Sequence, residues 1–439
     1  MRLLSIIISA ALLAGCGLLP GPARPTSKAG TPAPLLTQTA RASTGTPAPD
    51  TTLTPAPATP ATPVGAPVAL RVWLPPEFTP DVSTRSGQLL SDQIQAFETA
   101  HPGTAVEIRT KAASGAGGLL NALATAANAA PSVLPDVIAL SRDDLVAASA
   151  AGLVTPLDTL LPAETLADFY PYSLAMARVG GLWVGLPFAG DARVLAYMST
   201  AYDEPPLHWS DVVTGPMALP VAEPTGLTVL DSYLAAGGTL ADANGKLHVD
   251  PEALSMTLEA YQHLQTAGIL LPNTVDYADA ATAWQALRER RANLAVTSAQ
   301  LFFAEYFRVS GASATLLPTM GEPPVALADG WSWAVVNTAP ERHALSAQLI
   351  RWLDAPEQNG PWSEAAGVLP TRAASLAQWK ETGPSGVALQ VVAHAQLQPL
   401  ASVLATVGPA LQEALTTVLN GRATPFAAAA VAAAAVNQP

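Results

Sequence analysis

Short apolar runs alternate with amphipathic segments from residue 69 to residue 151, and this alternation limits the possible folds more than any other feature. Residues 69–74 and 134–140 have the length and composition of buried strands. Residues 88–100 and 142–151 carry apolar side chains at helical spacing, and Gly152 follows the second of these helices. Because strands that alternate with helices form parallel sheets covered on both faces, we expect an α/β fold.

The alternation continues through the second half of the chain. Residues 294–297 and 332–337 are expected strands, and residues 344–353 and 409–420 are expected helices. The part that can fold, from residue 68 onward, has about 370 residues, whereas a single core usually supports roughly 250–300. We therefore expect two lobes.

The N-terminus has the composition of a secretory signal. A basic start, Met1-Arg2, precedes an apolar run over residues 3–13, and small residues then lead to Cys16. This arrangement resembles a bacterial lipobox, whose cysteine becomes the diacylated first residue of the mature protein. We expect residues 1–15 to be a signal peptide and Cys16 to carry acyl chains such as palmitate. The alternative is a cysteine that ends an ordinary signal peptide.

Cys16 is the only cysteine in 439 residues, so the chain can form no internal disulfide and has no other thiol for catalysis. Residues 16–67 then form an expected tether, rich in proline and threonine and without aromatic residues. Such a segment cannot bury enough apolar area to offset its chain entropy, so we expect it to be extended and disordered. It would hold the folded part away from the cell membrane, outside the cytoplasm.

The charge balance excludes one class of partner. The chain has 34 acidic and 21 basic residues, for a formal net charge of −13. This acidic excess argues against a nucleic-acid partner, which requires a basic surface. No apolar run after residue 19 is long enough to span a bilayer.

Residues 180–197 combine a turn, apolar runs and charged groups. Gly180-Gly181 predicts a tight hairpin turn, and residues 182–186 predict a short strand that Pro187 would end. Residues 188–193 would then be an irregular loop that carries Asp191 and Arg193. An ordinary surface loop and a ligand-holding loop are both compatible with this local pattern.

The order of several segments resembles the family 1 extracellular solute-binding proteins, the maltose-binding-protein-like receptors of ABC importers. The resemblance lies in Pro-Asp-Val-Ile at residues 135–138, Gly-Leu-Val-Thr-Pro-Leu-Asp at 152–158 and Trp-Val-Gly-Leu-Pro at 183–187. It continues with Gly-Trp at 330–331 and Gly-Val-Leu-Pro-Thr-Arg at 367–372. The resemblance, carried by the order and spacing of these segments, covers essentially all of residues 68–425.

The resemblance implies a two-lobed α/β fold of the periplasmic-binding-protein type II kind, with a hinge and a cleft between the lobes. One lobe would comprise residues 68–196 and 331–368, and the other residues 197–330 and 369–439. Such receptors close on a solute like a Venus flytrap and deliver it to an ABC permease. It further implies a monomer without a cofactor or metal that binds a small polar solute, a sugar or polyol being favoured.

Candidate solute-binding residues follow from the crossings between the lobes. Trp331 and Trp333 lie on one expected crossing strand and share a face by strand alternation, and Trp73 ends the first strand at the edge where ligands usually bind. Asp191 and Arg193 would offer hydrogen bonds to hydroxyl groups. The alternatives are core packing for the tryptophans and an internal salt bridge for the charged pair.

One segment departs from the maltose-type pattern. Those proteins carry Gly-Pro-Trp or a similar sequence after the strand that corresponds to residues 294–297, and its aromatic ring stacks on sugar. This chain has Ser298-Ala299-Gln300 instead. Ser298 and Gln300 could hydrogen-bond to a solute, but the missing aromatic platform argues against a large oligosaccharide.

Two other functional classes remain open at this point. Gly-Trp-Ser-Trp-Ala at residues 330–334 resembles a serine-hydrolase nucleophile elbow around Ser332, but tryptophans flank the serine and the strand continues past it. Asp143-Asp144 begin a helix, where carboxylates more often cap than catalyse. We therefore expect no enzyme. A surface lipoprotein with a structural or scaffold role is the second alternative.

Overall fold

The structure is a computed structural model that describes residues 68–321, 323–380 and 382–438. The expected signal peptide, the lipidated Cys16 and the tether over residues 16–67 lie outside the described residues.

The described residues form strands and helices in the order that the sequence pattern indicates. The strands are β1 (Val68–Leu74), β2 (Thr104–Thr110), β3 (Val137–Ser141), β4 (Arg178–Val179), β5 (Leu182–Trp183), β6 (Leu186–Met198), β7 (Met217–Ala218), β8 (Leu294–Ser298), β9 (Ala312–Thr315), β10 (Ala326–Val335) and β11 (Ala395–Leu397). The helices are α1 (Arg85–Ala100), α2 (Leu119–Ala129), α3 (Arg142–Ala150), α4 (Pro171–Ala177), α5 (Leu227–Ala235), α6 (Pro251–Thr266), α7 (Ala280–Arg288), α8 (Ala299–Glu305), α9 (Pro340–Leu353), α10 (Pro356–Ala366), α11 (Ala373–Leu376), α12 (Gly383–His394), α13 (Ala401–Leu419) and α14 (Pro425–Val436).

The sheet is mixed, whereas the sequence pattern predicted a parallel one. The order β2-β1-β3-β10-β6-β8-β7 is joined by β9 beside β6 and β11 beside β10. β1 pairs in parallel with β2 and β3, but β10 runs antiparallel to β3 and β6, and β6 runs antiparallel to β8. The prediction was wrong on this point because strand direction depends on where long connections return, which local periodicity does not record.

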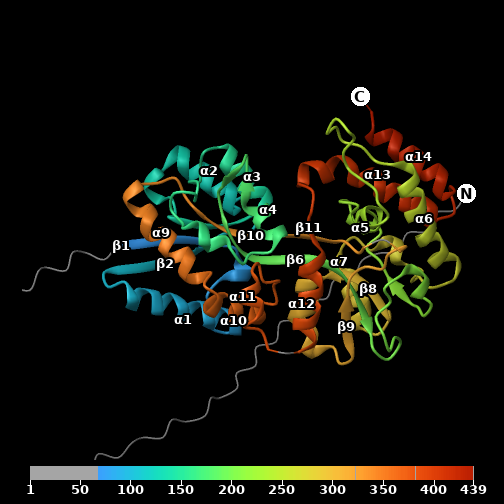
Figure 1. The fold of residues 1–439 in the computed structure, drawn as a ribbon, viewed down its shortest axis with the longest axis horizontal. Helices are drawn as coiled ribbons and strands as arrows, with labels where there is room; N and C mark the ends of the chain where they lie inside the picture. Colours follow the sequence, from blue (N-terminus) through green and yellow to red (C-terminus); the bar gives the residue numbers. More distant parts are fainter. Residues whose placement is uncertain (1–67, 322, 381, 439) are drawn as a thin grey trace, which may run out of the picture. The chain divides into compact units, whose positions relative to one another are not determined.

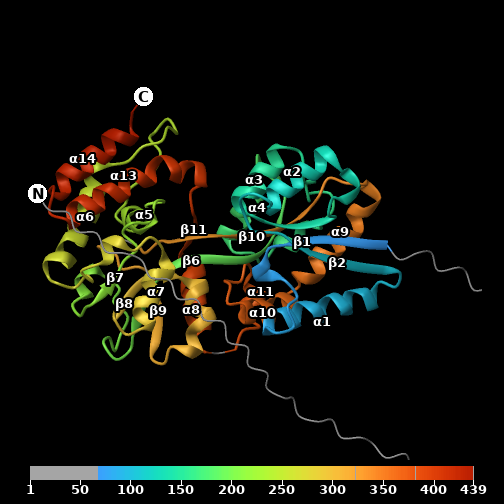
Figure 2. The same cartoon turned by 180° about the vertical axis from the view of Figure 1, so that it is seen from behind.

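β6 connects two halves of the sheet. Its first part, through Ala192, pairs with β10, and its second part, from Arg193, pairs with β8. β10 likewise pairs with β3 over Trp331–Val335 and with β11 over Ala326–Ala328. Figures 1 and 2 show β6 and β10 passing together between the elements around β1 and β2 and those around β8.

The expected break at Pro187 does not occur. β6 runs without interruption through residues 188–193, which the sequence pattern predicted to be an irregular loop. The register between β6 and β10 shifts between Trp331 and Ser332, next to the position where Ser332 faces Pro187. A proline has no amide to donate to the ladder, so a β-bulge beside it lets the strand continue.

Apolar packing divides the described chain at these two strands. Two core clusters surround β1–β3 and include Leu70, Phe97 and Leu140, and two others surround β8 and include Tyr233 and Phe302. We call the elements around the first pair (β1–β3, α1–α3, α9 and α10) the first lobe. Those around the second pair (β7–β9, α5–α8 and α12–α14) are the second lobe.

Two local predictions have different outcomes. Gly180 and Gly181 have φ values of 59° and 85° and join the antiparallel strands β4 and β5, so the hairpin turn is confirmed. The helix predicted over residues 409–420 begins earlier, at Ala401, with Pro409 inside it. The prediction was wrong because a proline was taken as the first helical residue.

In the described ranges, none of the helices combines the length and the apolar character required to cross a bilayer.

Candidate functional site

Strand ends from both lobes meet beside the two crossing strands. In the first lobe, β3 ends at Ser141, which pairs with Trp331 of β10. In the second lobe, β8 ends at Ser298, which pairs with Arg193 of β6. Ligands of open α/β sheets bind outside the carboxyl ends of strands, so the segment around Gly190 is the candidate site for a small solute.

Asp191 links β6 to the start of α8. Its Oδ1 accepts hydrogen bonds from the backbone amides of Ala192, at 2.8 Å, and Gln300, at 2.9 Å. Ser298 caps α8 by accepting a hydrogen bond from the Leu301 amide. The structure therefore brings together three residues that the sequence singled out, Asp191, Ser298 and Gln300. All three are half-buried.

Burial raises the pKa of Asp191 to about 6, against the opposing effect of the amide hydrogen bonds from Gln300 and Ala192. The hydrogen bonds stabilise the carboxylate, and the loss of hydration opposes it. The pKa of Asp191 is thus raised toward the neutral range, where a neighbouring charge can change its ionisation.

Asp329 lies opposite Asp191 and was missed by the sequence analysis. The two residues pair in register across β6 and β10, and both are half-buried. Burial raises the pKa of Asp329 to about 6, Arg142 acts to lower it, and Asp143 and Asp191 act to raise it further. Asp329 lies two residues before Trp331, just outside the expected crossing strand, and this closeness to a predicted site residue was a signal that could have identified it.

The three predicted tryptophans have different surroundings. Trp331 is half-buried and makes an edge-to-face contact with Phe78, with ring centroids 5.6 Å apart. Trp333 is only 4 % exposed and stacks on Phe188, with ring centroids 4.3 Å apart. Trp73 is also buried, and the Lys111 ammonium lies 4.9 Å from its ring centroid. Of the three rings, that of Trp331 is the one that is partly open to solvent.

Arg193 is held inside the second lobe. Its guanidinium forms ion pairs with Glu223, at 3.1 Å, and with Asp231, at 2.8 Å, and it donates a hydrogen bond to Thr228. Burial raises the pKa of Asp231 to about 7 while the Arg193 charge acts to lower it. The side chain is thus committed to an internal network, as in the alternative of an internal salt bridge. Solute contact by any of the seven predicted residues stays a prediction.

Ser332 is placed poorly for nucleophilic catalysis. Its side chain is fully buried, and its hydroxyl has no hydrogen-bond partner among the described residues. A Cβ added at Gly185 would lie 2.8 Å from the Ser332 Cβ, so the serine packs against this glycine. A nucleophilic serine needs a base within hydrogen-bond reach and access to substrate, and Ser332 shows neither in the described part of the chain. The same described residues contain no group of three or more His, Cys, Asp or Glu side chains that could hold a metal ion.

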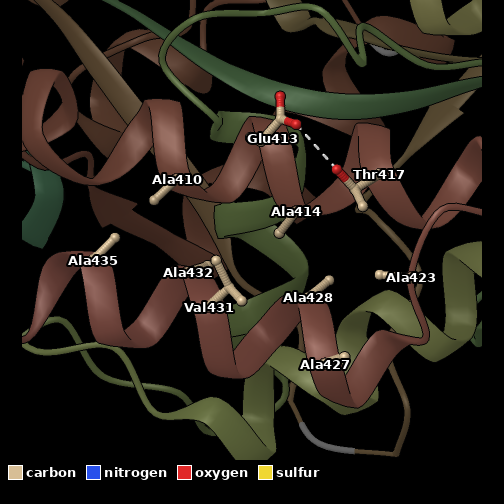
Figure 3. A pocket seen from close by; sticks show the side chains of 10 residues that line it. All are labelled: Ala410, Glu413, Ala414, Thr417, Ala423, Ala427, Ala428, Val431, Ala432 and Ala435. Carbon is tan, nitrogen blue, oxygen red and sulfur yellow. Dashed lines mark hydrogen bonds between the residues drawn. The ribbon is translucent and has the colours of Figure 1, made fainter.

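An apolar groove lies elsewhere in the second lobe. Its volume is about 320 Å³. Figure 3 shows it between α13 and α14, with a lining that consists mostly of alanine side chains. Glu413 and Thr417 contribute polar atoms at one end, and they hydrogen-bond to each other at 3.1 Å. A polar solute needs several convergent donors and acceptors, so this groove suits it less well than the segment around Asp191 and Asp329.

The family described as bacterial extracellular solute-binding protein matches residues 92–386 of the chain. A search of curated protein sequences gave no match.

Among solved structures, the maltose-bound MalE3 of T. maritima is similar with a TM-score of 0.65 and 21% identity, over 84% of this chain and 99% of that one. The cyclic α-maltosyl-1,6-maltose-binding protein of Arthrobacter globiformis gives a TM-score of 0.69 at 17% identity, over 84% of this chain and 98% of that one. An ABC transporter solute-binding protein of Thermotoga lettingae, bound to α-D-tagatose, gives 0.64 at 21% identity, over 84% and 99%.

These structures share the two-lobed α/β fold with this chain, and the family match spans well over half of its length. The chain therefore belongs to the bacterial extracellular solute-binding proteins.

Proposed function

We propose that the protein is a membrane-anchored receptor that binds a small polar solute, a sugar or polyol, and delivers it to an ABC import permease. The observation that carries this proposal is the pair Asp191 and Asp329, which face each other across the crossing strands where the strand ends of both lobes meet. Their carboxylates can accept hydrogen bonds from hydroxyl groups, and the partly open ring of Trp331 can pack against the C–H face of a small sugar.

The choice of a sugar or polyol is supported by the solutes of similar structures, which include maltose and α-D-tagatose. A small solute is favoured over a long oligosaccharide because Gln300 stands where an aromatic platform would be needed. Anchoring through Cys16, the tether, a monomeric state and the lobe boundaries at residues 196, 330 and 368 belong to the same proposal. In it the two lobes move about the crossing strands, and the solute favours the closed arrangement through its higher affinity for it.

A solute panel tests the receptor directly. The purified protein is melted in the presence of single monosaccharides, disaccharides and polyols, and each solute is then measured chromatographically after incubation. We expect a rise in melting temperature with a few related solutes and full recovery of each of them. Consumption of the solute would show an enzyme, and the absence of any shift across the panel would favour the scaffold alternative.

Two variants place the site. Asp191→Asn and Trp331→Ala should each lower the apparent affinity for the solute, measured from the melting-temperature shift, at least tenfold. Phe307→Ala should leave it unchanged, because Phe307 is 83% exposed and lies on the short turn after α8. Undiminished affinity in both site variants would contradict this location. Anchoring is tested separately by labelling cells with a palmitate analogue, which Cys16→Ser should abolish.

A further inference from the structure

Helix α13 receives its N-terminal cap from the other lobe. The residue before the helix, Leu400, has no side chain that could accept a hydrogen bond from the first turn. Instead Oδ1 of Asp143, in the first turn of α3, accepts a hydrogen bond from the Ala401 amide at 2.9 Å. The first four amides of a helix lack partners within it, and a carboxylate at this end also interacts favourably with the helix dipole.

A second contact joins the same two segments. Arg142, the residue before Asp143, donates a hydrogen bond from its guanidinium to the carbonyl oxygen of Gln398. The Gln398 amide in turn donates to the carbonyl of Ala328 in β10, at 2.8 Å. The segment from Gln398 to Ala401 is therefore held between a crossing strand and the start of α3.

These contacts lie beside the candidate site. α3 begins directly after Ser141, which pairs with Trp331. Arg142 is also the cation whose charge acts to lower the pKa of Asp329. A movement of the lobes that separates α3 from α13 would expose the Ala401 amide and leave Asp143 without this partner.

We propose that Asp143 and Arg142 form a latch between the lobes, which favours the arrangement in which the starts of α3 and α13 meet next to the solute site. The donor and the acceptor of each contact both belong to the chain itself, so the latch favours this arrangement of the lobes even without solute. A helix cap of this type shifts the equilibrium between the capped and the uncapped arrangement of the lobes by about fivefold. The latch concerns the same site as the proposed function, but its test needs no solute, so either can fail while the other stands.

The variants remove the contact from each side. Asp143→Ala removes the acceptor, and Asp144→Ala is the matched control because it removes the same charge from the same turn of α3. Ala401→Pro removes the donor from the second lobe, at a first helical position where proline is well accepted. Leu400→Asp supplies α13 with a cap of its own at a residue that already has extended backbone.

Two readouts separate capping from latching. Amide hydrogen exchange of the full chain reports on the first turn of α13. Spin labels at two exposed positions, Ala96→Cys in α1 and Met256→Cys in α6, report the distance between the lobes by pulsed EPR in a Cys16→Ser background.

We expect Asp143→Ala to speed exchange in the first turn of α13 about fivefold and to shift the distribution of distances between the lobes. Ala401→Pro should give the same shift in distance, and the double variant should give a shift no larger than either single variant. Leu400→Asp in the Asp143→Ala background should restore the protection of α13 but not the distances. The latch is overturned if Asp144→Ala acts as strongly as Asp143→Ala, if the distances stay unchanged, or if Leu400→Asp restores them.

Discussion

Asp191 of β6 and Asp329 of β10 oppose each other in register on the two strands that join the lobes, and burial raises the pKa of each to about 6. The negative charge of Asp191 acts to raise the pKa of Asp329, and Arg142 is the basic side chain whose charge acts to lower it. The crossing strands therefore not only connect the lobes but also carry the two carboxylates of the candidate site.

The first prediction concerns the pH dependence that Asp329 imparts. Its pKa is raised from 3.8 to about 6 by burial, so the folded protein is destabilised as the pH rises from about 4 to about 6 and this penalty is complete above pH 6. Asp329→Asn lacks this penalty. The unfolding free energy of the wild type minus that of the variant should therefore fall by at most about 3 kcal/mol between pH 4 and pH 7.

Urea unfolding across this range measures that difference. In an Asp191→Asn background, which removes a neighbouring negative charge, the pH-dependent part should shrink. A difference between wild type and Asp329→Asn that is the same at pH 4 and pH 7 would contradict the buried setting of Asp329.

The second prediction concerns the Arg193 network. Arg193→Met leaves Asp231, which is 1% exposed, without its cationic partner, and removal of one member of a buried pair costs about 3–5 kcal/mol. Adding Asp231→Asn should recover part of this loss, most clearly above pH 7, because an unpaired Asp231 must there either stay buried as a charge or take up a proton. Denaturant unfolding measures both.

Arg291→Met provides the control for that loss, because Arg291 pairs with Glu289 at the surface and otherwise donates a single hydrogen bond, to the Tyr277 hydroxyl at 2.8 Å. It should lose clearly less stability than Arg193→Met. Equal losses in the two arginine variants would show that the Arg193 network contributes no more than a surface pair.

The third prediction separates two tryptophans on one strand. Trp333→Ala empties a buried position against Phe188 and should cost about 3–5 kcal/mol of unfolding free energy. Trp331→Ala should cost clearly less, because Trp331 is only half-buried. Equilibrium unfolding followed by circular dichroism distinguishes them, and the reverse order of the two losses would contradict their assigned environments.

The fourth prediction tests the close passage of α4 over β6. A Cβ added at Gly190 would lie 2.4 Å from the Tyr172 hydroxyl, which donates a hydrogen bond to the Pro370 carbonyl at 3.1 Å. Gly190→Ala should therefore destabilise the protein by about 1–3 kcal/mol. Tyr172→Phe removes the clashing oxygen, so the double variant should lose less than the sum of the two single losses.

Gly386→Ala is the matched control for this series. Gly386 lies in α12, and an added Cβ there would meet nothing within 4 Å. Alanine at such a helix position should stabilise by up to about 1 kcal/mol. Additive losses at Gly190 and Tyr172 would rule out the steric account.

The sequence by itself determined the elements and the family. Apolar periodicity marked β1, β3, α1 and α3 to within a few residues, because each of these elements buries one face and repeats at its own period. Ordered short segments, such as those at residues 152–158 and 367–372, indicated the solute-binding family before any fold was known. Asp191 was singled out because a charged residue between two apolar, strand-like runs is placed where a ligand could be held.

Only the tertiary structure decided which polar groups share the site. It showed that Pro187 lies within a continuous strand, since the bulge beside it depends on a partner strand about 145 residues away. It paired Asp191 with Asp329 and placed Arg193 in an internal network with Asp231. It also joined Asp143 to Ala401 across 258 residues. Local periodicity cannot encode these relations, because they arise where distant strands and helices pack together and bury their charged side chains next to one another.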